Sequence, residues 1–141
     1  MIKLRFLLYR DKAKKLIVNL HLGAGATDYV EKLIDEAIDK PCKYCGENIT
    51  IENMRIDHII PLLRSRIPNK KHKKNVYTKE ELDVLYDKEN IQVICKECNA
   101  IKGSLSEDDF VWLLKVLAER EHVKKEVFKR MKAGSCVFRR F

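Results

Sequence analysis

Two pairs of cysteines, Cys42-Lys-Tyr-Cys45 and Cys95-Lys-Glu-Cys98, constrain the fold of this 141-residue chain more than any other feature. A CxxC turn presents two sulfurs to one ion with little strain, and zinc favours four thiolate ligands in a tetrahedron. The pairs lie 49 residues apart, so one ion can bind both only if the fold brings distant segments together. We therefore predict one structural Zn²⁺ ion held by Cys42, Cys45, Cys95 and Cys98. Redox-active or purely buried cysteines are the alternatives.

The overall composition indicates an ordinary globular protein, with 45% hydrophobic and 35% charged residues. No apolar run approaches the roughly 20 residues of a membrane span. The basic N-terminus, residues 1–10, lacks an apolar stretch long enough for a signal peptide. We therefore expect a cytoplasmic protein with no membrane partner. In a reducing compartment, CxxC pairs are typical of metal ligands rather than of disulfides.

The net charge of +8 is unevenly distributed along the chain. Residues 58–77 hold six Lys or Arg residues and no Asp or Glu, and residues 115–141 are also strongly basic. Such zones indicate a polyanionic partner, with nucleic acid ahead of a membrane surface. For residues 115–141 a solvated surface is an equally good interpretation. The predicted nucleic-acid contacts are therefore those in the first zone: Arg64, Arg66, Lys70, Lys71, Lys73 and Lys74.

Apolar periodicity predicts a mixture of helices and short strands. Residues 28–39 have helical spacing, with Thr27 as the expected N-cap, whereas residues 49–60 alternate as one or two strands. Residues 2–22 suit either a strand pair or a helix. Further along, Thr78-x-x-Glu81 forms a capping box that predicts a short helix.

Residues 91–94 are predicted to form a short strand, followed after Cys95 by a helix that ends or bends at Gly103. Ser106-x-x-Asp109 is expected to cap a final helix that continues to Gly134. We expect core packing for Trp112, which lies near the apolar stripe of this helix.

Asp57, His58 and Asn99 are candidates for a second, catalytic metal site. Asn99 follows Cys98 at the start of a predicted helix, where successive side chains point about 100° apart, so it faces away from the zinc. Carboxylate and amide oxygens suit a hard divalent cation, and a histidine kept off the metal is able to act as a base. Adjacent residues of a strand face opposite sides, so Asp57 and His58 share a site only if the strand ends or twists there, as Pro61 favours.

The quoted motifs resemble the HNH endonucleases of the ββα-metal type. The resemblance rests on Cys42-x-x-Cys45, Asp57-His58-Ile-Ile-Pro61, Asn90-Ile-Gln-Val-Ile-Cys95-x-x-Cys98-Asn99 and Lys102-Gly103, which cover about residues 42–103. It implies a strand pair carrying the histidine, packed on a helix carrying the last metal ligand.

Carried over residue by residue, the resemblance assigns a role to each candidate. Asp57 and Asn99 ligate the catalytic Mg²⁺ or Mn²⁺, His58 activates water, Asn90 fixes the loop that orients His58, and Lys102 reaches a phosphate. Two features depart from the family pattern. Asn99 stands where histidine is common, and 31 residues separate His58 from Asn90.

The sequence thus predicts an α+β fold, a ββα-metal nuclease core braced by a structural zinc and flanked by N- and C-terminal helices. Residues 1–41 form an N-terminal extension, residues 42–104 the core with a basic insertion at 62–77, and residues 105–141 a C-terminal helical region. The predicted function is metal-dependent endonuclease cleavage of DNA. A non-catalytic zinc module that binds nucleic acid is the alternative, RNA is a further possible substrate, and a homodimer through the apolar faces of the terminal helices is left open.

Overall fold

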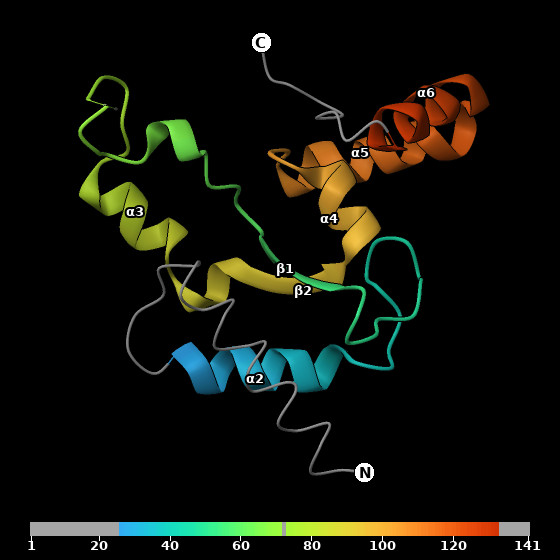
Figure 1. Ribbon diagram of the computed structural model, residues 1–141, viewed down its shortest axis with the longest axis horizontal. Helices are drawn as coiled ribbons and strands as arrows, with labels where there is room; N and C mark the ends of the chain where they lie inside the picture. The colour runs from blue at the N-terminus through green and yellow to red at the C-terminus, as the bar shows by residue number, and fades with distance from the viewer. Residues whose placement is uncertain (1–25, 72, 133–141) are drawn as a thin grey trace.

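The structure of the chain is a computed structural model that describes residues 26–71 and 73–132 (Figure 1). The segment 2–22, predicted as a strand pair or a helix, lies outside the described residues. Among the described residues, no helix has the length and apolar character needed to cross a membrane.

At the centre of the fold is a two-stranded antiparallel sheet. β1 (Met54–His58) pairs with β2 (Ile91–Cys95), and the register places Met54 opposite Cys95 and His58 opposite Ile91. The short helix α4 (Lys96–Lys102) follows β2 directly and packs against both strands. These three elements form the predicted ββα core, and the α+β class is confirmed.

Helices cover the two sides of this strand pair. In Figure 1, α2 (Ala26–Ala37) lies below the strands, whereas α4, α5 (Glu107–Glu119) and α6 (Glu121–Lys132) lie above them. The amphipathic α2 buries Val30 and Ile34, which lie four residues apart on one helical face. It begins at Ala26, so Thr27 lies inside the first turn and is not the predicted N-cap.

A further helix, α3 (Lys79–Leu85), lies beyond the basic insertion. Its N-terminus has the predicted capping box, because Thr78 accepts a hydrogen bond from the Glu81 N–H and the Glu81 side chain accepts one from the Thr78 N–H. Two 3₁₀ turns, η1 (Arg64–Arg66) and η2 (Lys88–Asn90), flank α3 along the chain.

The C-terminal helix is broken, contrary to the prediction of one continuous helix. Arg120 adopts an extended conformation between α5 and α6, and the two helices pack against each other. At about 1.5 Å per residue, a straight helix would carry Val127 roughly 15 Å beyond Leu117 and away from the core. The break allows α6 to fold back, and Val127 is buried in the same hydrophobic cluster as Leu117.

The prediction that Trp112 packs in the core is wrong, because its side chain is 65% exposed. The inward stripe of α5 consists of Phe110, Leu113 and Leu117. At about 100° per residue, position 112 points roughly 200° away from position 110 and therefore outward.

Candidate metal and active site

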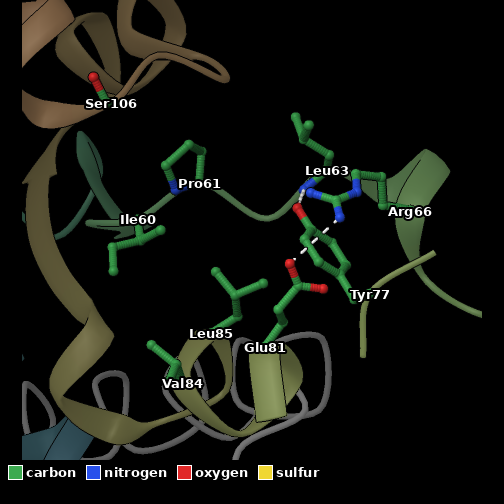
Figure 2. A pocket seen from close by; sticks show the side chains of 9 residues that line it. All are labelled: Ile60, Pro61, Leu63, Arg66, Tyr77, Glu81, Val84, Leu85 and Ser106. Carbon is green, nitrogen blue, oxygen red and sulfur yellow. Dashed lines mark hydrogen bonds and ion pairs between the residues drawn. The ribbon is translucent and has the colours of Figure 1, made fainter. Parts of the chain in front are cut away.

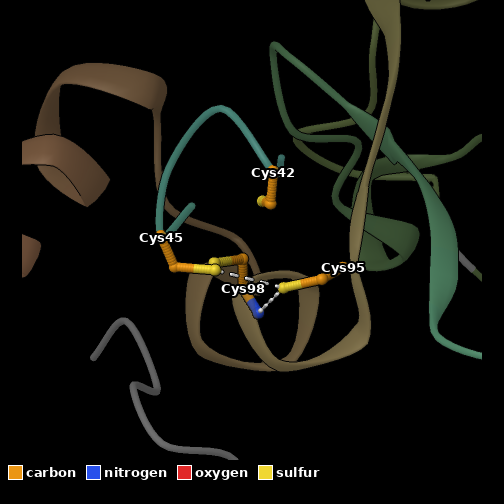
Figure 3. Close-up of side chains that lie close together, drawn as sticks. All are labelled: Cys42, Cys45, Cys95 and Cys98. Carbon is orange, nitrogen blue, oxygen red and sulfur yellow. Dashed lines mark hydrogen bonds between the residues drawn. The ribbon is translucent and has the colours of Figure 1, made fainter. Parts of the chain in front are cut away.

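The four predicted zinc ligands come together at one end of the strand pair. Cys42 and Cys45 lie on the turn after α2, whereas Cys95 ends β2 and Cys98 lies in the first turn of α4 (Figure 3). Their sulfurs all lie within 4.8 Å of one another, and Cys45 and Cys95 are 3.6 Å apart. Tetrahedral Zn–S bonds of about 2.3 Å place sulfurs about 3.8 Å apart, so the cluster fits one zinc ion.

Backbone geometry positions both cysteine pairs. The first turn is closed by hydrogen bonds from the Gly46 N–H to the Cys42 carbonyl and from the Cys42 N–H to the Glu47 carbonyl. Gly46 has a φ of 77°, a conformation that suits glycine. In the second pair, the Cys95 sulfur accepts a bond from the Cys98 N–H and so caps α4.

The thiols of this cluster do not ionise alike. Burial opposes ionisation of Cys42, but hydrogen bonds from the backbone of Cys95, Cys45 and Tyr44 outweigh it and lower the pKa of Cys42 to about 7. Burial is the largest effect at Cys95, where it raises the pKa to about 12, and it also raises the pKa of Cys98 above its usual value. A cation bound at the cluster would favour the thiolate forms of Cys95 and Cys98, as expected of a zinc site.

Asp57 lies at the other end of β1 in a buried polar network. Its Oδ2 atom is 2.9 Å from the ammonium nitrogen of Lys102 and accepts a hydrogen bond of 3.0 Å from Gln92 Nε2. Within the described residues, these are its only polar side-chain contacts, so neither His58 nor Asn99 bonds to this carboxylate.

His58 is the last residue of β1 and is half-buried, with its Nε2 atom inside the protein. Both Asp57 and His58 pair with β2, so their side chains leave opposite faces of the pleat. β1 ends at His58, and a shared site for the two residues stays a prediction.

Asn90 is buried beside the loop that follows His58. Its Oδ1 atom accepts a hydrogen bond of 2.8 Å from the Ile60 N–H, and its Nδ2 atom donates to the carbonyls of Ile60, at 3.1 Å, and of Leu85, at 3.0 Å. The Ile59 N–H also donates to the Asn90 carbonyl. One side chain thus links the exit from β1 to the end of α3.

Lys102 is placed differently from the prediction that it reaches a phosphate. Its side chain is 0% exposed, and the ammonium donates to the carbonyl oxygens of His58, at 2.9 Å, and of Ile59, at 3.5 Å, besides contacting Asp57. A fully buried ammonium that makes these contacts faces inward, not toward a ligand in solvent. Its position on α4 explains this, because Cys98, Ile101 and Lys102 form the buried face of that helix.

Asn99 lies in the middle of α4, one residue after a zinc ligand and one turn before Lys102. It is half-buried, and its side-chain amide makes no hydrogen bond within the described residues, so the amide oxygen is available to a ligand.

The basic insertion exposes most of its cations. Arg64, Lys70, Lys71, Lys73 and Lys74 are exposed, whereas Arg66 is drawn inward. The Arg66 guanidinium lies 4.2 Å from the Tyr77 ring centre and 3.5 Å from Glu81 (Figure 2). It also donates to the Asn75 carbonyl. Arg66 therefore braces the insertion, a role that sequence reasoning did not assign.

A cavity of about 450 Å³ lies between this insertion and α3. Its lining, drawn in Figure 2, is mostly apolar and includes Ile60, Val84 and Leu85. It contains none of the predicted catalytic or metal-binding residues, so the cavity is separate from the polar network around Asp57.

Comparison with known protein families identifies the core. Residues 42–105 match the family model "HNH endonuclease". The chain contains an HNH endonuclease domain. This match starts at the first zinc-site cysteine and ends just beyond α4, so it spans the whole ββα core. None of the curated proteins and none of the solved structures matches the chain significantly.

Sequence reasoning missed a hydrogen-bond network that reaches Asp57 through Gln92. Glu107 accepts hydrogen bonds from Lys43 and Tyr44. Both of these residues also bond to Gln92, which donates in turn to Asp57. One signal was available in the sequence, because Gln92 is a polar residue in the otherwise apolar strand Ile91-Gln-Val-Ile94.

Proposed function

We propose that the protein is a metal-dependent endonuclease that hydrolyses phosphodiester bonds of DNA. In this proposal His58 takes a proton from the attacking water, and Asp57 and Asn99 hold the catalytic Mg²⁺ or Mn²⁺. Asn90 and Lys102 act as positioning residues through the backbone around His58. The zinc cluster joins the turn after α2 to the end of β2 and the start of α4.

The observation that carries the proposal is the fixation of the backbone next to His58. Asn90 bonds both the N–H and the C=O of Ile60, and the Lys102 ammonium contacts the carbonyls of His58 and Ile59. Two buried polar side chains from separate elements thus restrain three consecutive residues. A general base must be held within hydrogen-bond reach of the proton that it removes, and such restraint supports that role.

The donors at Asp57 and Asn99 fit a hard divalent cation. Asp57 offers the oxygen that Lys102 and Gln92 do not contact, and Asn99 offers an amide oxygen that makes no hydrogen bond within the described residues. When bound, the metal polarises the phosphate and stabilises the negative charge that develops on the leaving 3′ oxygen.

The exposed cations of the insertion are proposed to hold the DNA backbone. Arg64 and the four lysines are free of ion pairs to other described residues, and they present positive charge on the segment that follows the candidate site. Phosphate contacts of this kind position a duplex but carry little sequence information.

A non-catalytic zinc module that binds nucleic acid accounts for the cysteines and for the positive charge. It gives no reason to bury an Asp–Lys pair and an asparagine around the end of β1, because burial of such groups costs free energy. The endonuclease therefore explains more of the described contacts.

A plasmid-nicking assay separates these two functions. Zinc-loaded protein should convert supercoiled DNA to open circles only when Mg²⁺ or Mn²⁺ is added, and His58→Ala should lower the rate about 10²–10⁴-fold. Zinc content and DNA affinity should stay near wild type. His122→Ala is the matched control, because His122 is an exposed histidine on α6.

The outcomes differ for each component of the proposal. Binding without cleavage under any divalent metal would identify a binding module. Cleavage by His58→Ala within a few-fold of wild type would exclude His58 as the base. Faster cleavage of RNA than of DNA would change the substrate class.

A further inference from the structure

Gln92 is a buried polar side chain that contacts Asp57. It lies directly opposite Asp57 in the β1–β2 register and is 8% exposed. Burial of an amide without hydrogen bonds costs on the order of 1–3 kcal/mol by protein mutational data, so a glutamine here requires partners. The structure supplies three.

The three hydrogen bonds determine the orientation of the amide. Gln92 Oε1 accepts from the Lys43 ammonium at 3.0 Å, and Nε2 donates to the Tyr44 hydroxyl at 2.9 Å and to Asp57 Oδ2 at 3.0 Å. A flipped amide would place its oxygen against the carboxylate and its NH₂ group against an ammonium. Because both contacts would be repulsive, only one orientation satisfies all the partners.

Two of the three partners of Gln92 belong to the zinc site. Lys43 and Tyr44 are the two residues between Cys42 and Cys45, so a zinc ion held by those cysteines also restrains their backbone. Their side chains are held in turn by Glu107 at the start of α5, which lies 2.6 Å from the Lys43 ammonium and accepts from the Tyr44 hydroxyl at 2.9 Å. The Tyr44 ring also packs edge-on against Phe110 at 4.8 Å.

Both contacts to Asp57 involve the same oxygen. Gln92 and Lys102 approach Oδ2 from β2 and from α4, and rotation of the carboxylate would break both contacts. Within the described residues, Oδ1 makes no hydrogen bond, so it is the oxygen that the network leaves to a metal.

From these contacts we infer that Gln92 is a positioning residue, which holds Asp57 with Oδ1 directed to the catalytic metal and which is itself held by Lys43 and Tyr44 of the zinc turn. The inference rests on the proposed role of Asp57 as a metal ligand. It makes the cluster of four cysteines more than a brace for the fold, because the zinc turn supports the catalytic carboxylate through a single side chain.

The test measures metal binding directly, as the Mn²⁺ dissociation constant of zinc-loaded protein from the electron paramagnetic resonance signal of free Mn²⁺. The Mn²⁺ binding that is lost in Asp57→Ala is assigned to the site at Asp57. Gln92→Leu should weaken binding at this site about 10–100-fold, the usual effect of removing a group that orients a metal ligand. Tyr44→Phe, which keeps the ring and loses only the hydroxyl, should weaken it in the same direction by a smaller factor.

Tyr77→Phe is the matched control. Its hydroxyl accepts a hydrogen bond from the Leu63 N–H at 3.0 Å, so the change removes a comparable contact that has no connection to Asp57. Mn²⁺ affinity should be unchanged in this variant. If Gln92→Leu does not fold, Tyr44→Phe decides the question, because its loss is confined to one hydroxyl.

Failure of the inference differs from failure of the proposed function. Mn²⁺ affinity within threefold of wild type in both Gln92→Leu and Tyr44→Phe would overturn the inference, even if the protein is an active nuclease. Binding that Asp57→Ala leaves intact would overturn it as well. The inference would be supported and the nuclease refuted if the wild type binds Mn²⁺ at Asp57 but cleaves no DNA, and if the two variants bind Mn²⁺ more weakly.

Discussion

Replacement of Asn90 by alanine should loosen the exit from β1 without unfolding the protein. The change removes the hydrogen bonds to the Ile60 N–H, the Ile60 carbonyl and the Leu85 carbonyl. At about 1 kcal/mol per net hydrogen bond, the loss is about 3 kcal/mol. Ile60 is 51% exposed, so water can replace part of its bonding, whereas Leu85 is buried. A domain with about 5–15 kcal/mol of stability survives such a loss.

The effect on catalysis should exceed the effect on binding. If Asn90 orients His58 through Ile60, Asn90→Ala should lower kcat by at least tenfold and leave KM for DNA nearly unchanged. Urea unfolding gives the stability change, and hydrogen exchange of the Ile59 and Ile60 amides gives the local opening.

Asn53→Ala is the matched control for this prediction. Asn53 accepts a hydrogen bond from the Thr50 N–H at 2.7 Å and donates one to the Asn48 carbonyl at 2.9 Å. It precedes the first residue of β1, at the opposite end of the strand from His58. It should cost about 2 kcal/mol by the same estimate and leave kcat unchanged. The reasoning is refuted if Asn90→Ala changes the unfolding free energy by less than about 0.5 kcal/mol and leaves exchange at Ile60 unaltered.

Three further predictions concern the zinc cluster, the buried ion pair and the basic insertion. Cys98→Ser should give unfolded or insoluble protein, and elemental analysis of the wild type should find one zinc per chain. A folded, zinc-free and active preparation would contradict the structural role of the zinc. Lys102→Met should destabilise the protein by about 3–5 kcal/mol in urea unfolding, because it leaves Asp57 buried without its cation. The double variant Lys102→Met with Asp57→Asn should recover part of this loss of stability. A loss below about 1 kcal/mol in the single variant would argue against the pair. Replacing four exposed lysines of the insertion by glutamine should weaken DNA binding and reduce the slope of its log–log salt dependence by about 0.9 per lost phosphate contact. The same change at four exposed lysines of α5 and α6 is the control and should have less effect on DNA binding. An equal effect of the two sets would locate the DNA elsewhere. The two sets are Lys70, Lys71, Lys73 and Lys74, and Lys115, Lys124, Lys125 and Lys129.

The sequence by itself determined the parts of this protein that depend on short spacings. The Thr78-x-x-Glu81 capping box and the strand before Cys95 were predicted and are present, because each depends on residues within a few positions of one another. The motifs around Asp57, Asn90 and Asn99 also indicated the HNH family before the fold was known.

Only the tertiary structure decided which way several side chains turn. Lys102 was expected to face a phosphate, but α4 packs so that the ammonium meets Asp57, a residue 45 positions earlier in the chain. Gln92 gained its role in the same way, from partners on the zinc turn and on β1. The break at Arg120 is a further case, since folding α6 back buries Val127 in the core.

The physical reason for this division is the range of the interactions. Caps, turns and amphipathic stripes act within one or two helical turns, so a local pattern contains all the information that they need. The partner of a long side chain, such as Lys102 or Arg66, depends on how separate elements pack. That packing is a balance of burial and hydrogen bonding over the whole chain, and no single spacing in the sequence records it.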